Sequence, residues 1–305
     1  MDEFDGWREA ARERISARER TSGLRVGAEA DARAERMLGK VFSHGYPADG
    51  SDLVRVLGND GQLGTLWVWR SGSRAVILDA DLWERVRDED LRSLRDLVRE
   101  WAAASGAESL SIEAFRGDAT TWRFVQSGPS VSSSIQMILE PFPRRATTGD
   151  ARIPSLMPMT PARFVQYFRE SVDSFAESLL AAGGLSPEEA EKESLEQFED
   201  NLPDGLDTPS QHLYTAVVDD TEVGILWFGI QDRADSRQAF IFDIEVTAEL
   251  RGRGFGRAIM IAAENEAQRL GATSMGLHVF ADNARAVRLY ESLSYDRVQE
   301  HLFLP

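Results

Sequence analysis

In RGRGFGR, residues 251–257, glycines alternate with bulkier residues and arginines stand at both ends. A strand pattern precedes this segment and a helix pattern follows it, so successive backbone N–H groups can point at one anion. Glycines leave room for a pyrophosphate to approach the backbone, and Arg251, Arg253 and Arg257 supply positive charge. The segment therefore predicts an anion-binding loop, although a glycine-rich turn with solvated arginines has the same composition.

Two other phosphate-binding patterns do not fit this segment. The dinucleotide fingerprint GxGxxG places its first glycine directly at the end of a strand. Here the order is GxGxG, and the residues TAEL separate the strand pattern from the loop. The P-loop pattern, GxxxxGK followed by Ser or Thr, is absent from the sequence. The loop therefore favours neither a dinucleotide-binding domain nor a P-loop nucleotidase.

Two acidic residues stand inside the apolar strand pattern AFIFDIEV, residues 239–246. Because side chains alternate along a strand, Asp243 and Glu245 lie on one face. Such a pair can act as a general base and a cation anchor, with Glu245 favoured as the base because it is nearer the loop. In the alternative interpretation, one or both bond to a neighbouring strand or face solvent.

The composition limits the classes of partner. The formal net charge of -17 argues against a nucleic-acid binder and suits attraction of a cationic amine, although it also suits a solvated surface. The chain has no cysteine, and its four histidines show no close ligand spacing, so we expect no disulfide and no metal. It has neither a membrane-length apolar run nor a secretory signal, so we expect a cytoplasmic protein without a membrane partner.

The sequence contains an internal duplication. The segment SGAESLSIEAFRGDATTWRFVQS (105–127) aligns with LGATSMGLHVFADNARAVRLYES (270–292) without a gap. A second segment, NDGQLGTLWVW (59–69), aligns with DDTEVGILWFG (219–229) at a slightly smaller offset. Two related halves are therefore expected.

Each half predicts helices first, then a strand hairpin, a strand, a helix, a strand, a short helix and a last strand. We expect an α/β fold of the mixed α+β type, with two tandem domains that are each a mixed, mainly antiparallel sheet flanked by helices. The domains would cover 1–145 and 159–305. A surface linker, rich in Pro, Thr and Gly, would join them at 146–158.

These residues resemble a known family. RGRGFG fits the R/Q-x-x-G-x-G/A signature of the GNAT acyl-CoA N-acyltransferases, at Arg251, Gly254 and Gly256. LHVFADNARAVRLYESLSY (277–295) is similar to the family's second signature, L-x-V-x-x-x-N-x-x-A-x-x-L-Y-x-x-x-G-F/Y, with Ser294 in place of its glycine. The duplication extends the fold to the first half, and two copies with one altered are similar to the architecture of mycothiol synthase.

The resemblance implies acetyl-CoA as co-substrate and direct attack by an amine, without an acylated enzyme. It implies that Tyr290 protonates the leaving thiolate. Because an alkylammonium must lose a proton before it attacks, we expect Glu245 or Asp243 to be the base. The implied cofactor-binding residues are Val246, Arg251, Gly252, Arg253, Gly254, Phe255, Gly256, Arg257 and Asn283.

The first half does not keep the glycine loop. VRDEDL (86–91) stands opposite RGRGFG, with Glu89 and Leu91 in place of Gly254 and Gly256. Side chains there would block close approach, and carboxylates would repel a pyrophosphate. We expect this half to be a degenerate GNAT-like domain with a structural role.

We therefore expect an acetyl-CoA-dependent N-acetyltransferase that acts on a primary amine of a small molecule or peptide in its C-terminal domain. The alternatives are a non-catalytic acyl-CoA-binding or assembly protein and an N-acyltransferase with a longer acyl donor. The chain would be a monomer, as a pseudo-dimer of tandem domains, or a homodimer.

Overall fold

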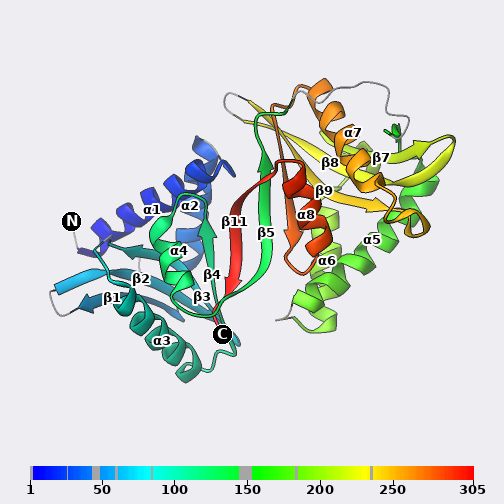
Figure 1. Cartoon of the computed structure of the whole chain (residues 1–305). Coiled ribbons are helices and arrows are strands. Elements are labelled where there is room, and N and C mark those ends of the chain that lie inside the picture. The colour runs from blue at the N-terminus through cyan, green and yellow to red at the C-terminus, as the bar shows by residue number, and fades with distance from the viewer. Residues whose placement is uncertain are drawn as a thin grey trace. The chain divides into compact units, whose positions relative to one another are not determined.

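The computed structural model describes residues 3–25, 27–42, 49–58, 61–83, 85–143, 153–182, 185–233 and 236–305 (Figure 1). The chain divides into two compact units. Unit 1 consists of Met1–Gln136 and Arg297–Pro305, and unit 2 of Met137–Asp296. In the described part of the chain, no helix is long and apolar enough to cross a membrane.

Unit 1 is a mixed sheet with helices on both faces. Its strand order is β1-β2-β3-β4-β11, followed by the first part of β5, Val131–Gln136. Strands β3 and β4 are parallel, whereas β1–β2, β2–β3 and β4–β11 are antiparallel pairs. Its elements are α1 (Glu3–Ser22), α2 (Ala28–Val41), β1 (Ser51–Gly58), β2 (Gly61–Ser71), β3 (Arg74–Leu82), α3 (Asp88–Ala104), β4 (Ser109–Phe115), α4 (Ala119–Gln126), β5 (Val131–Leu139) and β11 (Asp296–Phe303).

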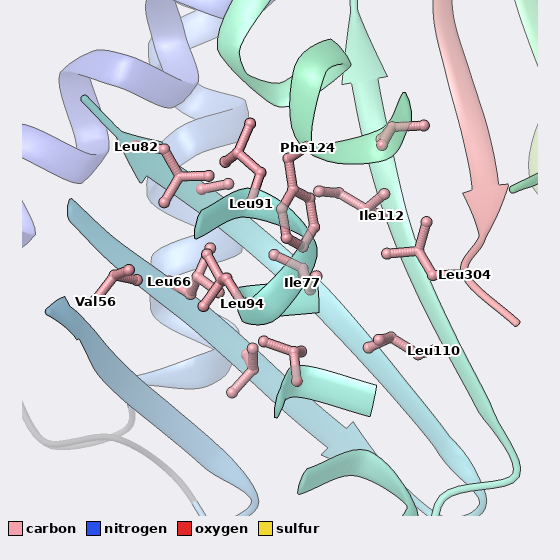
Figure 2. Close-up of a cluster of buried hydrophobic side chains, with 14 of the residues drawn as sticks. Val56, Leu66, Ile77, Leu82, Leu91, Leu94, Leu110, Ile112, Phe124 and Leu304 are labelled. Atoms are coloured by element: carbon pink, nitrogen blue, oxygen red, sulfur yellow. The ribbon is translucent and has the colours of Figure 1, made fainter. Parts of the chain in front are cut away.

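The two faces of this sheet have separate apolar cores. Leu66 of β2 packs with Leu91 of α3 and Phe124 of α4, as Figure 2 shows. Its neighbour Trp67 belongs to a second cluster with Leu38 of α2. All five side chains are at most 1% exposed. Because successive side chains of a strand point to opposite faces, one strand supplies both cores.

Unit 2 repeats this plan. Its strand order is β6-β7-β8-β9-β10, followed by the end of β5, Met137–Leu139. Strands β9 and β10 are parallel, and the pairs β6–β7, β7–β8 and β8–β9 are antiparallel. Its further elements are β6 (Ser155–Pro158), α5 (Pro161–Ala182), α6 (Pro187–Asn201), η2 (Gly205–Asp207), β7 (Gln211–Val218), β8 (Thr221–Asp232), β9 (Arg237–Val246), η3 (Ala248–Leu250), α7 (Phe255–Arg269), β10 (Ser274–Phe280) and α8 (Ala284–Ser292).

Equivalent glycines show that the duplication extends to backbone packing. A Cβ on Gly64 would stand 2.2 Å from the carbonyl oxygen of Asp81, and one on Gly224 would stand 2.1 Å from that of Glu245. In both units only glycine allows the second hairpin strand to approach the next strand this closely. The predicted mixed α/β fold of two related halves is confirmed.

The last strand differs from the predicted domain division. The strand pattern at 297–304 was expected in the domain 159–305, but β11 belongs to unit 1, where it pairs with β4 from Gln299↔Phe115 to Phe303↔Ser111. Correspondingly, Met137–Leu139 of β5 belongs to unit 2. A strand pattern specifies which face is buried, whereas the choice of partner strand depends on long-range hydrogen bonds that the pattern does not encode.

The predicted linker also contains regular structure. Ser155–Pro158 form β6, which pairs with β7 and is the edge strand of unit 2. Proline is tolerated at such an edge because its missing N–H is not needed for a second neighbour. Residues 146–152 of the predicted linker lie outside the described residues.

Candidate active site

Strands β9 and β10 pair along only part of their length. Their parallel pairs run from Gln238↔Ser274 to Ile241↔Leu277. Strand β9 nevertheless continues to Val246, and β10 continues to Phe280. Beyond Ile241, the described ends of the two strands are not paired with each other. Backbone groups of β9 next to the glycine loop can therefore bind a third partner.

A β-bulge orients the acid pair of β9. Trp227 of β8 pairs with Asp243 and Phe228 pairs with Ile241, so Phe242 is the extra residue. Asp243 and Glu245 both line one cavity, as their spacing predicts, and the bulge brings Phe242 to the same cavity. The two carboxylates thus share a binding surface in unit 2.

The cavity has a volume of about 180 Å³. Three serines of α5 stand on consecutive turns of one helix face and line it: Ser171, Ser174 and Ser178. The remaining lining residues come from α5, α6, β8 and β9, namely Phe175, Gln197, Phe198, Asn201, Trp227, Phe242, Asp243 and Glu245. Aromatic rings form the apolar wall, so the polar groups converge on the two carboxylates.

Asp243 accepts hydrogen bonds from two hydroxyl groups of α5. Its Oδ2 is 3.0 Å from the Oη of Tyr167 and 3.4 Å from the Oγ of Ser171. Burial, with a smaller effect of the neighbouring Glu245, raises the pKa of Asp243 to about 7. Glu245 is exposed at the cavity. The carboxylates therefore differ: one is enclosed and half protonated near neutral pH, and the other is open to solvent.

The glycine loop has the backbone conformation that its composition predicts. Gly252 and Gly254 have φ angles of 84° and 89°, which non-glycine residues rarely adopt. Gly254 is the N-cap of α7 and Ala258 donates the first helical hydrogen bond to it. The preceding N–H groups of the first turn have no acceptor within the helix, so they can donate to an anion.

The loop arginines have different roles. Arg251 donates from Nε to the carbonyl oxygen of Val246 at 3.1 Å, which ties the loop to the end of β9. Arg257 donates to the Oγ of Ser292, and Arg253 is exposed. A guanidinium nitrogen of Arg285 lies 3.9 Å from the position that a Cβ on Gly252 would occupy. Arg285 is thus a cation near the loop that the sequence did not single out.

Helix α8 contributes the second motif. Tyr290 is 7% exposed, and burial, together with the charge of Asp243, raises the pKa of Tyr290 to about 12. Its hydroxyl therefore stays protonated at neutral pH. Asn283 caps α8 by accepting the N–H of Ala286 at 3.1 Å, so its side-chain oxygen is directed to its own helix. Phe255 is half-buried as the first residue of α7. Ser294, in the glycine position of the motif, has a φ of 68°.

In unit 1 the equivalent helix start carries its own negative charge. Asp88, Glu89 and Asp90 form the first turn of α3, and Asp90 accepts the backbone N–H of Arg87 at 3.3 Å. Arg123 pairs with Asp88 at 2.7 Å. In unit 1, carboxylates of the chain itself thus surround the start of α3. In unit 2, the corresponding start of α7 has no side-chain cap.

The structure brings together residues that the motifs did not mark. Val246, the loop and the acid pair converge at one end of β9, but the opposite wall comes from Tyr167, Ser171 and the other serines of α5. No motif identifies these hydroxyls. Extending the alignment of 59–69 with 219–229 back to the first helix of each half would have drawn attention to two of these serines, because it aligns Ser174 with Arg14 and Ser178 with Arg18.

A splayed parallel strand pair that leads into a glycine loop at a helix start, in a mixed α/β fold, is typical of acyl-CoA-dependent N-acyltransferases. The sequence pattern of the Acetyltransferase (GNAT) family matches residues 173–295. The chain belongs to this family and is an N-acetyltransferase. Enzymes of the family generally use acetyl-CoA.

Three similar proteins illustrate the range of relatives. The uncharacterized N-acetyltransferase YycN of Bacillus subtilis is 33% identical over 141 residues, which are 46% of this chain and 90% of YycN. Mycothiol acetyltransferase of Renibacterium salmoninarum is 32% identical over 88 residues, 28% of this chain and 26% of that protein. The structure of a GCN5-related N-acetyltransferase from Sphaerobacter thermophilus is 17% identical in sequence. Its match to this chain covers 95% of this chain and 89% of that protein, with a TM-score of 0.49.

Proposed function

We propose that unit 2 transfers an acetyl group from acetyl-CoA directly to a primary amine of a small molecule or peptide. The observation that carries this proposal is the unpaired end of β9, which has the glycine loop at its terminus and two carboxylates at its cavity face. Binding, acyl donation and proton transfer would then occur along one strand.

The residues of the loop fit a pyrophosphate. Gly252 and Gly254 have left-handed backbone angles, and the N–H groups of the first turn of α7 would donate to the anion. Arg253 and Arg285 add positive charge at the same end of the helix. Acetyl-CoA supplies the acyl group as a thioester, and the backbone of Val246 orients it. The group that reacts therefore lies beside the last residues of β9.

The two carboxylates have separate roles in this proposal. Glu245 is one residue from Val246 and exposed, so it can take a proton from an ammonium group and pass it to water. A free alkylammonium has a pKa of about 10, so the amine must lose a proton before it attacks. Asp243 is enclosed by α5 and anchors positive charge on the acceptor.

Tyr290 is proposed to protonate the leaving thiolate. We expect Tyr290→Phe to lower kcat about 100-fold, as is typical for loss of a general acid, with an unchanged Kd for acetyl-CoA. Stopped-flow thiol release and calorimetry would measure the two quantities. Tyr295→Phe is the matched control, because Tyr295 is also buried and its ring lies 6.0 Å from that of Tyr290. Equal effects of the two substitutions would contradict the assignment.

The raised pKa of Asp243 predicts how stability depends on pH. Between the ordinary pKa of 3.8 and about 7, the folded state binds more protons at this group than the unfolded state, so stability falls as pH rises through this window. The groups that face Asp243 are Tyr167 and Ser171 of α5, Glu245 of β9 and Tyr290 of α8. The tyrosines stay neutral in this window because the pKa of each is raised.

We therefore expect Asp243→Asn to gain about 1–2 kcal/mol of stability relative to the unmodified protein on going from pH 5 to pH 8. The full difference between the two pKa values corresponds to a larger change in the free energy of unfolding. The expected change is smaller because Asp243 keeps some exposure to solvent, which screens its charge. Chemical denaturation of both proteins at the two pH values measures this. A parallel pH dependence of both proteins would contradict it.

Thiol release with a panel of amines tests the proposed function directly. Acetyl-CoA, together with at least one primary amine, should release CoA, and mass spectrometry should find the acetyl group on nitrogen. Propionyl-CoA and longer donors in the same assay establish the acyl length. Tight CoA binding without turnover of any donor and amine would contradict the proposal.

A further inference from the structure

The cavity of unit 2 has a counterpart in unit 1 that the chain itself fills. Trp67 of β2 and Trp227 of β8 are equivalent in the duplication, and the sheet register pairs them with Asp79 and Asp243, respectively. In both units a bulge lies at this point in the register. Asp79 is therefore the structural equivalent of Asp243.

The first helices of the two units are equivalent as well. The alignment that equates Trp67 with Trp227 also places α1 on α5. It brings members of the unit 1 core that contains Trp67 into correspondence with members of an apolar core of unit 2 that contains Trp227. The corresponding core pairs are Trp7/Tyr167, Ile15/Phe175, Leu38/Phe198, Phe42/Leu202 and Leu53/Leu213. The same alignment places Arg14 on Ser174 and Arg18 on Ser178.

The two arginines of α1 neutralise the acids of unit 1. Arg14 reaches Asp79 at 2.7 Å and Asp81 at 3.2 Å, so one guanidinium bridges both carboxylates. Arg18 pairs with the other oxygen of Asp79 and donates to the carbonyl oxygen of Ala80 at 2.9 Å. Asp79 is 2% exposed, and each of its carboxylate oxygens contacts a guanidinium group; Arg18 also pairs with Asp118 at 2.8 Å.

Unit 2 keeps the acids but has lost these cations. Ser174 and Ser178 have much shorter side chains than arginine, Ser178 donates to the carbonyl oxygen of Ser174 within α5, and both line the cavity of about 180 Å³. Its described lining residues include two carboxylates and neither lysine nor arginine. A carboxylate that is enclosed without a cation costs free energy, which a cationic ligand would recover.

We propose that the acceptor places a guanidinium group in this cavity, at the position that Arg14 and Arg18 occupy in unit 1. This inference rests on the proposed acetyl transfer in unit 2, and it narrows the acceptor to compounds that carry both a primary amine and a guanidinium. The apolar wall of Trp227 and Phe242 suits the planar face of such a group.

The guanidinium and the reacting amine are different groups of the acceptor. A strand rises about 3.3 Å per residue, so Asp243 lies about 10 Å along β9 from Val246, beside which the acetyl group would be held. Glu245 serves the amine near the loop, while Asp243 and the serines of α5 hold the guanidinium. A short alkyl chain would connect the two ends.

Two isosteric amines test this assignment. Agmatine (4-aminobutylguanidine) and 4-aminobutylurea have the same shape, but only agmatine is charged at the distal end. With acetyl-CoA, we expect kcat/KM to be about 10–100-fold higher for agmatine, mainly through a lower KM. A hydrogen bond to a charged group typically strengthens binding by a factor of this size. Asp243→Asn should reduce the preference to about unity. Equal kcat/KM for both amines in the unmodified protein would overturn the proposal.

Grafting the arginines of unit 1 into unit 2 is an independent test. Ser174→Arg combined with Ser178→Arg should fill the cavity with an internal guanidinium and abolish the preference for agmatine over the urea, with an unchanged Kd for acetyl-CoA. Ser174→Met combined with Ser178→Met is the matched control, which adds volume without charge. An arginine variant that still prefers agmatine as strongly as the unmodified protein would argue against a shared cation position.

Calorimetry separates failure of this inference from failure of the proposed function. If no amine is acetylated, the proposal of acetyl transfer in unit 2 is wrong, but tighter binding of agmatine than of the urea to the chain of 305 residues would still support the cation cavity. If both amines are acetylated with equal efficiency and bind equally, the cavity assignment is wrong and the acetyltransferase proposal stands.

Discussion

Replacing Glu245 with glutamine is expected to lower kcat about 100–1000-fold, while the Kd for acetyl-CoA stays the same. General-base catalysis contributes a factor of this size, and glutamine keeps the shape of the side chain but cannot take a proton. Glu245 is exposed at the cavity and adjacent to Val246, so its loss should affect the chemical step rather than donor binding. Thiol-release kinetics at saturating amine and calorimetry with acetyl-CoA would measure both quantities.

The control for this substitution is Glu249→Gln. Glu249 is also an exposed glutamate of the same unit, but it does not line the cavity. The Glu249→Gln substitution should leave kcat within a factor of about two of the value for the unmodified protein. A loss of less than about threefold for Glu245→Gln would count against the base assignment. Asp243, with a pKa near 7, would then be the better candidate for the base.

Replacing Gly254 with glutamate is expected to weaken acetyl-CoA binding at least about 30-fold, because it adds a negative charge where the helix terminus attracts an anion. Glu89 aligns with Gly254 in the sequence, although it lies in the first turn of α3 whereas Gly254 is the N-cap of α7, so the substitution brings one carboxylate of the unit 1 helix start into unit 2. A non-glycine residue at a φ of 89° also costs about 1–2 kcal/mol of stability. Calorimetry with acetyl-CoA and denaturant unfolding would separate the two effects.

Gly271→Glu is the matched control for backbone strain. Gly271 has the same φ of 89° but follows the opposite end of α7. It should lose similar stability and keep its affinity for acetyl-CoA. If the two substitutions weaken acetyl-CoA binding equally, the loop is not the pyrophosphate site. The converse change, Glu89→Gly, should create no second binding site, because Asp88 and Asp90 remain at that helix start.

These experiments need both units of the chain. Because β11 belongs to unit 1 and pairs with β4, a fragment that ends near residue 145 lacks an internal strand of the unit 1 sheet. Loss of acetyl-CoA binding in such a fragment would not separate a missing site from a misfolded sheet. Point substitutions in each helix start avoid this ambiguity.

Local patterns were sufficient to predict most of the fold. The strand pattern at 239–246 lies within β9, and the helix expected after the glycine loop is α7. The positive φ angles of Gly252 and Gly254 follow from the alternation of glycines, because few other residues adopt this conformation. These features depend on residues that are close together in the sequence, so they can be predicted from a single sequence.

The candidate site was predicted only on the side that carries motifs. The shared face of Asp243 and Glu245 follows from the period of a strand. The hydroxyl partners from Tyr167 and Ser171 do not, since they are more than 70 positions away in the sequence. The pKa of Asp243 near 7 also depends on burial, which is a property of the packed structure.

The sequence by itself determined that this protein is a duplicated N-acetyltransferase fold with one intact glycine loop, because residue type at local spacing encodes turns, caps and strand faces. The tertiary structure decided three further points: β11 pairs in unit 1, α5 faces the acid pair, and Ser174 and Ser178 leave a cavity where unit 1 has Arg14 and Arg18. These depend on contacts between distant segments. Periodicity says which side of an element is buried, and only the folded chain says against what.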